Sequence, residues 1–227
     1  GGLYKNLKEL RDTAGTSKNN FFKAFGFDYI YLEEGNDVQK LVTVFESVKN
    51  TKKPIVVHIH TTKGKGFSFA ETKKERWHFS APFYTETGEL VKPADTNTCA
   101  FAIRNYLKNK AKLTKNLAVI TAATPGIFGF NEEFRNSLKK QYIDVGIAEE
   151  HAVALASALA KSGAKPVLAF NSSFIQRTYD QLSQDLALNK SPAVILVYRG
   201  ELSKASATHL GIFDLQLTNN IPNLVCL

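Results

Sequence analysis

Two adjacent carboxylates, Glu149 and Glu150, follow an apolar segment and begin a run of small residues. The pattern predicts a strand over 142–147 and a helix over 149–161 that ends at Gly163. Free backbone N–H groups and the helix macrodipole stabilise a carboxylate in the first turn of a helix. A helix cap is therefore the simplest interpretation of both acids. A working acid in an active site is the alternative, and neighbouring residues must support it.

The elements that follow would bring further polar side chains to the same place. We predict strands over 165–170 and 192–198, with a helix from Ser172 or Ser173 to about Leu188 between them. This alternation predicts an α/β fold, a parallel sheet with flanking helices, whose ligand crevice lies at the carboxyl ends of the strands. The residues at or just beyond those ends are Glu149, Asn171, Phe174, Arg177 and Arg199. We therefore expect them to share one site.

Three runs of residues carry a family resemblance: DVGIAEEHAV at 144–153, NSSFIQRTYDQ at 171–181 and THLGIFDLQLTNNIPN at 208–223. In this order and spacing they resemble the pyrimidine-binding domain of the 1-deoxy-D-xylulose-5-phosphate synthases, thiamine-diphosphate enzymes related to transketolase. Upstream, TKGKGF at 62–67 and then Trp77-His78 resemble the stretch by which those synthases leave their first domain. The resemblance covers about residues 25–227.

The resemblance implies three parts. Residues 1–62 would be the C-terminal part of the first, diphosphate-binding α/β domain, residues 63–95 an interdomain linker, and residues 96–227 a transketolase-type pyrimidine-binding domain, which we expect to be incomplete at its C-terminus. Within the first part, the patterns predict a weakly ordered lead-in over 1–20, strands over 27–32 and 55–61, and a helix over 37–49.

Two absences indicate that part of the protein is missing from this sequence. The chain contains no Met and therefore no start residue of its own, so we expect that sequence before Gly1 is missing. The Gly-Asp-Gly…Asn motif that holds magnesium and the diphosphate in the family is not found either. We therefore predict no metal ligand in this chain, and Mg²⁺ ligands in the missing N-terminal part.

The resemblance gives three residues a role at the cofactor. Glu149 matches the acid that hydrogen-bonds N1′ of the aminopyrimidine and promotes its imino tautomer, and burial in a dry pocket raises the pKa of an acid in the direction this needs. Phe174 matches the aromatic residue that stacks on that ring, although a core Phe is the alternative. Arg177, one helical step further on the same face, matches an arginine that lines the active site.

Other matches concern the substrates. Arg199 corresponds to an arginine that holds the phosphate of the acceptor aldehyde, although a surface ion pair is the alternative. His209 and His78 correspond to histidines that move protons near the reacting centre. Asn171 occupies a substrate-contacting position where the family has Tyr. The loop at 204–207 lacks a family Asp, so the cofactor chemistry is better supported than the acceptor.

The implied activity is that of a transferase of the transketolase class. With thiamine diphosphate it would condense pyruvate, with loss of carbon dioxide, and glyceraldehyde 3-phosphate to 1-deoxy-D-xylulose 5-phosphate, a precursor of isoprenoids, thiamine and pyridoxal phosphate. The alternatives are a synthase-like or transketolase-like paralogue with a different acceptor, and an inactive homologue or fragment that serves as an interaction module. The family also implies a homodimer, and we expect the isolated chain to be inactive.

Composition argues against other partners. The net charge is +8, but the Lys residues are scattered, which does not favour nucleic-acid binding. No apolar run approaches the length of a membrane span, and no signal peptide is visible. Cys99 and Cys226 predict reduced core residues in a cytoplasmic protein. His58 and His60 share a predicted strand without a third ligand in register, so core histidines are favoured over a metal pair.

Overall fold

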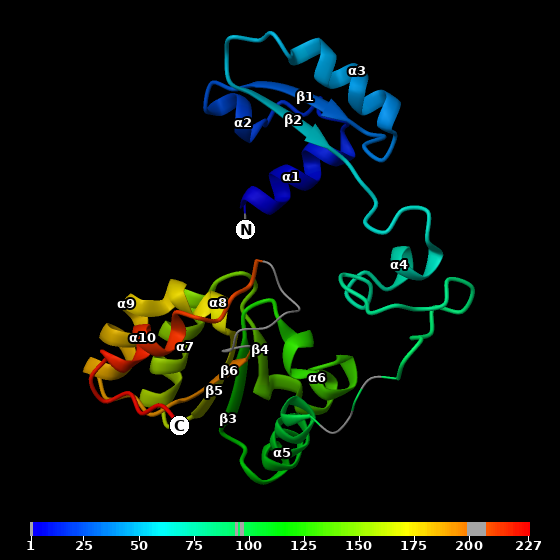
Figure 1. The fold of residues 1–227 in the computed structure, drawn as a ribbon. Helices are drawn as coiled ribbons and strands as arrows, with labels where there is room; N and C mark the ends of the chain where they lie inside the picture. Colours follow the sequence, from blue (N-terminus) through cyan, green and yellow to red (C-terminus); the bar gives the residue numbers. More distant parts are fainter. Residues whose placement is uncertain (1, 94, 96–97, 199–207) are drawn as a thin grey trace. The chain divides into compact units, whose positions relative to one another are not determined.

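The computed structural model describes residues 2–93, 95, 98–198 and 208–227. The chain forms two compact units, unit 1 over residues 1–94 and unit 2 over residues 95–227 (Figure 1).

Unit 1 contains a small parallel sheet. Strands β1 (Asp28–Leu32) and β2 (Ile55–Ile59) pair so that Asp28 lies opposite Ile55. Helix α3 (Val38–Val48) connects them, and the Asp37 side chain caps it by accepting from the backbone N–H groups of the second and third helical residues at 2.9 and 3.1 Å. The predicted strands and helix are confirmed here, with ends that differ by one or two residues.

The expectation of a weakly ordered lead-in is wrong. Residues 2–12 form helix α1 (Gly2–Asp12), and Leu10 is fully buried. Helix α2 (Phe21–Ala24) follows, capped by the side chain of Asn20. The prediction relied on the many Lys and Asn residues of this segment. It overlooked that Leu3, Leu7 and Leu10 repeat among them at helical spacing.

The segment predicted as a linker has local structure of its own. It contains helix α4 (Ser68–Thr72) and an isolated antiparallel bridge between Phe83 and Leu90. Aromatic rings gather around Trp77, whose centroid lies 4.5 Å from that of Phe83 and 5.0 Å from that of Phe67. Packing of aromatic rings has no sequence period, so the pattern gave no sign of it.

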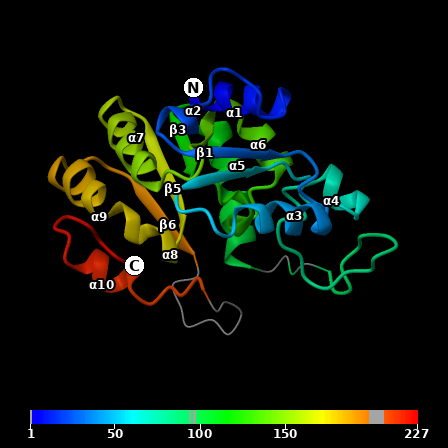
Figure 2. The same cartoon turned by 90° about the horizontal axis from the view of Figure 1, so that it is seen from above.

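Unit 2 is built on a parallel sheet of four strands in the order β4-β3-β5-β6. The strands are β3 (Leu117–Thr121), β4 (Tyr142–Asp144), β5 (Lys165–Asn171) and β6 (Val194–Tyr198). The predicted fold class is confirmed. Helices α5 (Cys99–Leu113) and α6 (Glu132–Leu138) lie on one side of the sheet, while α7 (Glu149–Lys161) and α10 (Asp214–Asn219) lie on the other (Figure 2).

Each face of this sheet carries its own core. Successive strand side chains point to opposite faces. In β5, Leu168 and Phe170 therefore pack in the cluster that contains Ala152 and Val153 of α7. Val167 of the same strand packs instead with Phe134 of α6 in the second cluster.

The helix predicted after β5 is interrupted. The chain forms α8 (Ser172–Ile175), a 3₁₀ turn η3 (Gln176–Thr178), α9 (Tyr179–Gln181) and a π-helical segment η4 (Leu182–Leu188). Two further 3₁₀ turns, η1 (Pro125–Phe128) and η2 (Lys139–Gln141), were not predicted. The strand predicted over 142–147 ends earlier, before Gly146 takes a left-handed φ of 76°.

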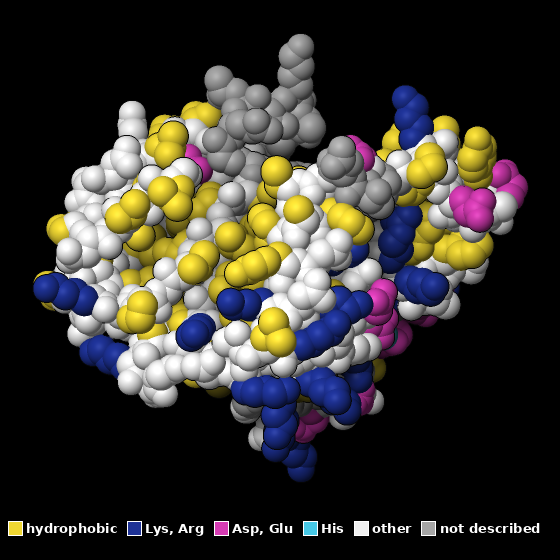
Figure 3. Space-filling model, turned by 90° about the horizontal axis from the view of Figure 1, so that it is seen from below, with side chains coloured by type: hydrophobic (Ala, Val, Ile, Leu, Met, Phe, Trp, Pro, Cys, Tyr) yellow, Lys and Arg dark blue, Asp and Glu magenta, His cyan; other side chains and the backbone are white. Residues whose placement is uncertain are grey.

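The structure also tests the predictions about membrane spans, cysteines and surface charge. In the described part of the chain, no helix combines the length and hydrophobicity of a membrane span. Both cysteines are free thiols but exposed, so the prediction of core cysteines is wrong. Figure 3 shows that basic, hydrophobic and acidic side chains are all exposed at the surface.

Candidate active site

The turn before α7 is held by Asp144, the last residue of β4. Its Oδ1 accepts backbone hydrogen bonds from Ala123 and Gly146, each at 2.9 Å. The first bond ties β4 to the segment after β3, and the second closes the turn where Gly146 adopts positive φ. The chain therefore enters α7 with Glu149 as its first residue.

Glu149 is buried in unit 2 with one oxygen left without a hydrogen bond. The residue is 2% exposed, and its Oε2 has no hydrogen-bond partner. Arg177 Nη1 lies 3.3 Å from that atom, within ion-pair distance but without hydrogen-bond geometry. A buried polar atom without a partner costs free energy. Such an atom is therefore suited to accept a hydrogen bond from a ligand, or to hold a proton that it donates.

Arg177 also contacts the second acid. Its Nε donates to Glu150 Oε1 at 3.3 Å, and both side chains are partly exposed. Glu150 therefore pairs with an arginine and not only with the helix terminus that the sequence suggested. A pair this exposed contributes little to folding, on the order of 1 kcal/mol or less.

A second contact joins Phe174 of α8 to His209. Their ring centroids are 5.4 Å apart with an interplanar angle of 80°, an edge-to-face arrangement. His209 Nδ1 also lies 2.8 Å from Thr208 Oγ1. The structure thus brings together Glu149 of α7 with Arg177 of η3, and Phe174 of α8 with His209 of the chain before α10.

The remaining predicted residues have different surroundings. Asn171 is 2% exposed and its Oδ1 accepts from Ser173 N at 3.3 Å as the cap of α8. His78 belongs to unit 1, where its Nδ1 accepts from Lys63 Nζ at 2.6 Å. Arg199 and the loop at 204–207 lie outside the described residues.

The histidines of β2 form protein contacts. Tyr29 OH lies 2.7 Å from Nδ1 of the part-buried His58, and His60 Nδ1 lies 2.8 Å from Glu33 Oε1. Burial lowers the pKa of His58. Across the described residues, no group of three or more His, Cys, Asp or Glu side chains is placed to hold a metal ion.

Sequence reasoning missed a buried pair beside the site. Ser172 Oγ donates to Asp214 Oδ2 at 2.8 Å, and both residues are buried. This bond joins the start of α8 to the start of α10. An acid within an otherwise apolar run, Ile212-Phe213-Asp214-Leu215, was the available signal.

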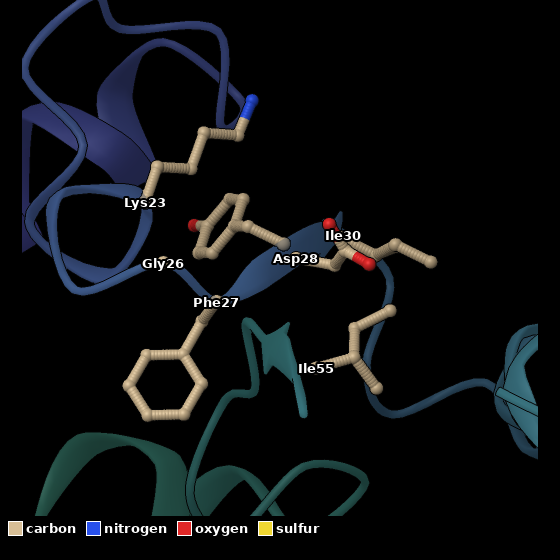
Figure 4. Close-up of a pocket in the computed structure, with 7 residues that line it drawn as sticks. Lys23, Gly26, Phe27, Asp28, Ile30 and Ile55 are labelled. Atoms are coloured by element: carbon tan, nitrogen blue, oxygen red, sulfur yellow. The ribbon is translucent and has the colours of Figure 1, made fainter. Parts of the chain in front are cut away.

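A hollow of about 580 Å³ lies in unit 1, away from these residues in the sequence. It is open and lined by Lys23, Gly26, Phe27, Asp28, Tyr29, Ile30 and Ile55 (Figure 4). No predicted site residue lines it.

Comparison with known proteins gives two family matches and many relatives. The transketolase pyrimidine-binding domain family matches residues 95–227, and the 1-deoxy-D-xylulose-5-phosphate synthase family matches residues 3–61. A relative from Campylobacter fetus with that synthase name is 39% identical over 205 residues, which are 90% of this chain and 34% of the relative. Relatives of the same name from Listeria monocytogenes and Clostridium kluyveri are 38% and 36% identical over 99% and 98% of this chain. The chain thus spans about a third of their length.

Proposed function

The chain belongs to the transketolase pyrimidine-binding domain family, and from that premise we propose that it is part of a 1-deoxy-D-xylulose-5-phosphate synthase. The proposed reaction joins pyruvate, with loss of carbon dioxide, to glyceraldehyde 3-phosphate and uses thiamine diphosphate. The observation that carries the proposal is the buried carboxylate of Glu149, whose Oε2 has no hydrogen-bond partner. The synthase name of the relatives supports the choice of reaction within the family.

The residues of unit 2 fit the pyrimidine half of this cofactor. A buried acid oxygen without a partner suits a ring nitrogen such as N1′, and the half-buried ring of Phe174 suits stacking. Thiamine diphosphate, when bound, supplies the carbon at C2 that takes up the acyl group of the donor. In the proposal, Glu149 holds a proton at N1′, where a dry environment strengthens the interaction.

The other residues orient the reactants and move protons. Arg177 places a positive charge beside the buried acid. His209, in contact with Phe174, is proposed to move a proton near the reacting centre, as is His78 of unit 1. Arg199 is proposed to hold the acceptor's phosphate with its planar fork of N–H groups. A direct substrate contact by Asn171 stays a prediction, because the side chain is used as a helix cap.

The remaining expectations belong to the same proposal. Residues 1–62 would be part of the diphosphate-binding domain, supported by the family match over 3–61, with residues 63–95 as the connection to the pyrimidine-binding domain. Mg²⁺, with ligands outside this sequence, a homodimer and a cytoplasmic location stay predictions. The paralogue and the interaction module are not favoured by the relatives named above.

Product analysis tests the proposed reaction. The intact protein that contains this chain, supplied with thiamine diphosphate, Mg²⁺, pyruvate and glyceraldehyde 3-phosphate, should release carbon dioxide and 1-deoxy-D-xylulose 5-phosphate in equal amounts. A protein that binds the cofactor but makes another product from a panel of aldehydes would support the paralogue. A protein that makes none from any acceptor would support the inactive homologue.

A further inference from the structure

The contacts of Arg177 are shared unequally between its two acids. Nε makes a hydrogen bond to Glu150 Oε1 at 3.3 Å, whereas Nη1 lies at the same distance from Glu149 Oε2 without making one. The buried acid therefore has a positive charge beside it, yet its oxygen is still open to a ligand. The partly exposed acid takes the directed bond.

This arrangement is not the one that Arg177 and Glu149 would adopt by themselves. An arginine beside a carboxylate favours two parallel N–H···O bonds, because the guanidinium fork matches the two oxygens. The drive toward such a pair is strongest for a buried acid, since a buried polar atom without a partner is costly. In the described structure, the directed bond of Arg177 goes instead from Nε to Glu150.

We propose that Glu150 is a positioning residue that holds Arg177 beside Glu149 and prevents it from closing onto the buried carboxylate. The charge of Glu149 is then compensated while its Oε2 stays open. The proposal rests on the proposed function for the identity of the ligand, thiamine diphosphate, but not for the geometry of the three side chains.

Two substitutions at position 150 separate the bond from the charge. Glu150→Gln keeps a side-chain oxygen that accepts from Arg177 Nε, whereas Glu150→Ala removes the acceptor. In Glu150→Ala, we expect Arg177 to turn and hydrogen-bond to Glu149 Oε2, so that the cofactor has to displace it. Thiamine diphosphate should then bind about two- to fivefold more weakly, which is the range for a partly exposed ion pair.

Calorimetry on the intact protein measures this effect. Glu150→Gln should bind thiamine diphosphate within twofold of the unchanged protein, although it has lost the charge. Glu132→Ala is the matched control, because Glu132 is also an acid in the first turn of a helix of unit 2, but on α6 and not on α7. It should leave the affinity unchanged.

A double substitution distinguishes positioning from a general loss of structure. If Arg177 blocks Glu149 in Glu150→Ala, then adding Arg177→Gln removes the blocking group and should restore part of the lost affinity. Two independent structural losses would instead add. An affinity of the double variant below that of Glu150→Ala would overturn the proposal.

Crystal structures of the unliganded intact protein provide a readout that does not depend on the reaction. The proposal requires Arg177 on Glu150 in the unchanged protein and in Glu150→Gln, and on Glu149 in Glu150→Ala. Arg177 in the same place in all three would contradict it, as would equal cofactor affinities of the Ala variant and the unchanged protein. If the unchanged protein binds no thiamine diphosphate, the proposed function is wrong. The position of Arg177 in the three crystal structures then decides by itself whether Glu150 is a positioning residue.

Discussion

In unit 2, all five residues of β3 are buried, whereas in unit 1 every residue of β2 keeps part of its surface exposed. Strand β3 lies inside a four-stranded sheet with a helical core on each face. Strand β2 pairs with one strand, and helix α3 beside it leaves Val38 73%, Val42 48% and Phe45 49% exposed.

The difference explains why unit 2 can keep a buried carboxylate in a fixed position. A carboxylate such as Glu149 stays buried only where surrounding side chains are fixed by packing, and unit 2 provides such packing around the start of α7. The exposed apolar residues of α3 lie at positions i, i+4 and i+7, so they form one face of the helix. We expect unit 1 to be the less stable unit.

The largest expected effect is chemical and is confined to unit 2. Glu149→Gln keeps the size of the side chain but removes the acid, so exchange of the C2 proton of bound thiamine diphosphate and turnover should fall by roughly 10²- to 10⁴-fold, the usual range for a general acid or base. The fold should be retained, as judged by circular dichroism of the intact protein.

The matched control for this change is Glu46→Gln, which alters an exposed acid of unit 1 paired with Lys49. It should leave both rates unchanged. Near-normal C2 exchange in Glu149→Gln would show that this residue has no part in the mechanism. The buried acid Glu149 would then differ from the exposed acid Glu46 in burial alone.

A pair of core substitutions tests the comparison of stability. Phe170 is 1% exposed in the core of unit 2, so Phe170→Ala should lower the free energy of unfolding of that unit by about 3–5 kcal/mol. Phe45 is 49% exposed, and Phe45→Ala should cost less than about 1 kcal/mol.

Denaturant unfolding of this chain separates the two responses. Trp77 is the single Trp and lies in unit 1, so its fluorescence follows that unit, while circular dichroism follows both. Equal losses for the two Phe substitutions would mean that the face of α3 is covered in solution.

Helix caps offer a smaller test, one in each unit. Asp37 caps α3 through two backbone N–H groups, and Thr98 caps α5 through that of Phe101 at 3.2 Å. Replacement of either cap by Ala should cost about 1 kcal/mol. Asp37→Ala should shift the Trp77 transition, and Thr98→Ala should leave it in place. A shift of both would show that the units unfold together.

Local patterns were sufficient wherever neighbours in sequence decide the structure. Helix α7 begins at Glu149 and is followed by Gly163 as predicted, because small apolar residues repeat through it and the glycine takes a left-handed φ of 85°. Strand β3 follows the same rule, because its five consecutive residues LAVIT bury both faces of the strand.

Long-range contacts explain what the patterns did not give. The chain over 172–188 has the apolar period of one helix, yet it changes between α, 3₁₀ and π geometry as its residues pack on α7 and β5. In the site, the sequence placed Glu149 and Arg177 at one edge of the sheet. It gave no sign that Glu150 would bind the same guanidinium, because the choice of partner depends on side-chain positions across 27 residues of chain.

The smallest expected effect is a pH dependence confined to unit 1. Burial lowers the pKa of His58 below its usual value near 6.5, and the charge of His60 lowers it further. The unfolded chain therefore binds the proton more readily than the folded one, so acidification favours unfolding. Stability should be full above about pH 6.5 and should fall as the pH drops through that value toward the lowered pKa. The loss should stay below about 1 kcal/mol, because His58 is only part-buried.

The variant His58→Gln is the control for this pH effect, because Tyr29 contacts the ring that it replaces. The Tyr29 hydroxyl lies 2.7 Å from His58 Nδ1 and can donate to the neutral ring, whereas protonation would place a second donor there. His58→Gln keeps an acceptor for Tyr29 but cannot titrate, so its Trp77 transition should be nearly the same at pH 7.5 and pH 5.5. The part of the circular dichroism transition that does not coincide with the Trp77 transition should show no matching change, because His58 has its contacts in unit 1. If the Gln variant loses as much stability on acidification as the unchanged chain, the titrating group is not His58, and the proposed difference in pH response between the units would have to come from elsewhere.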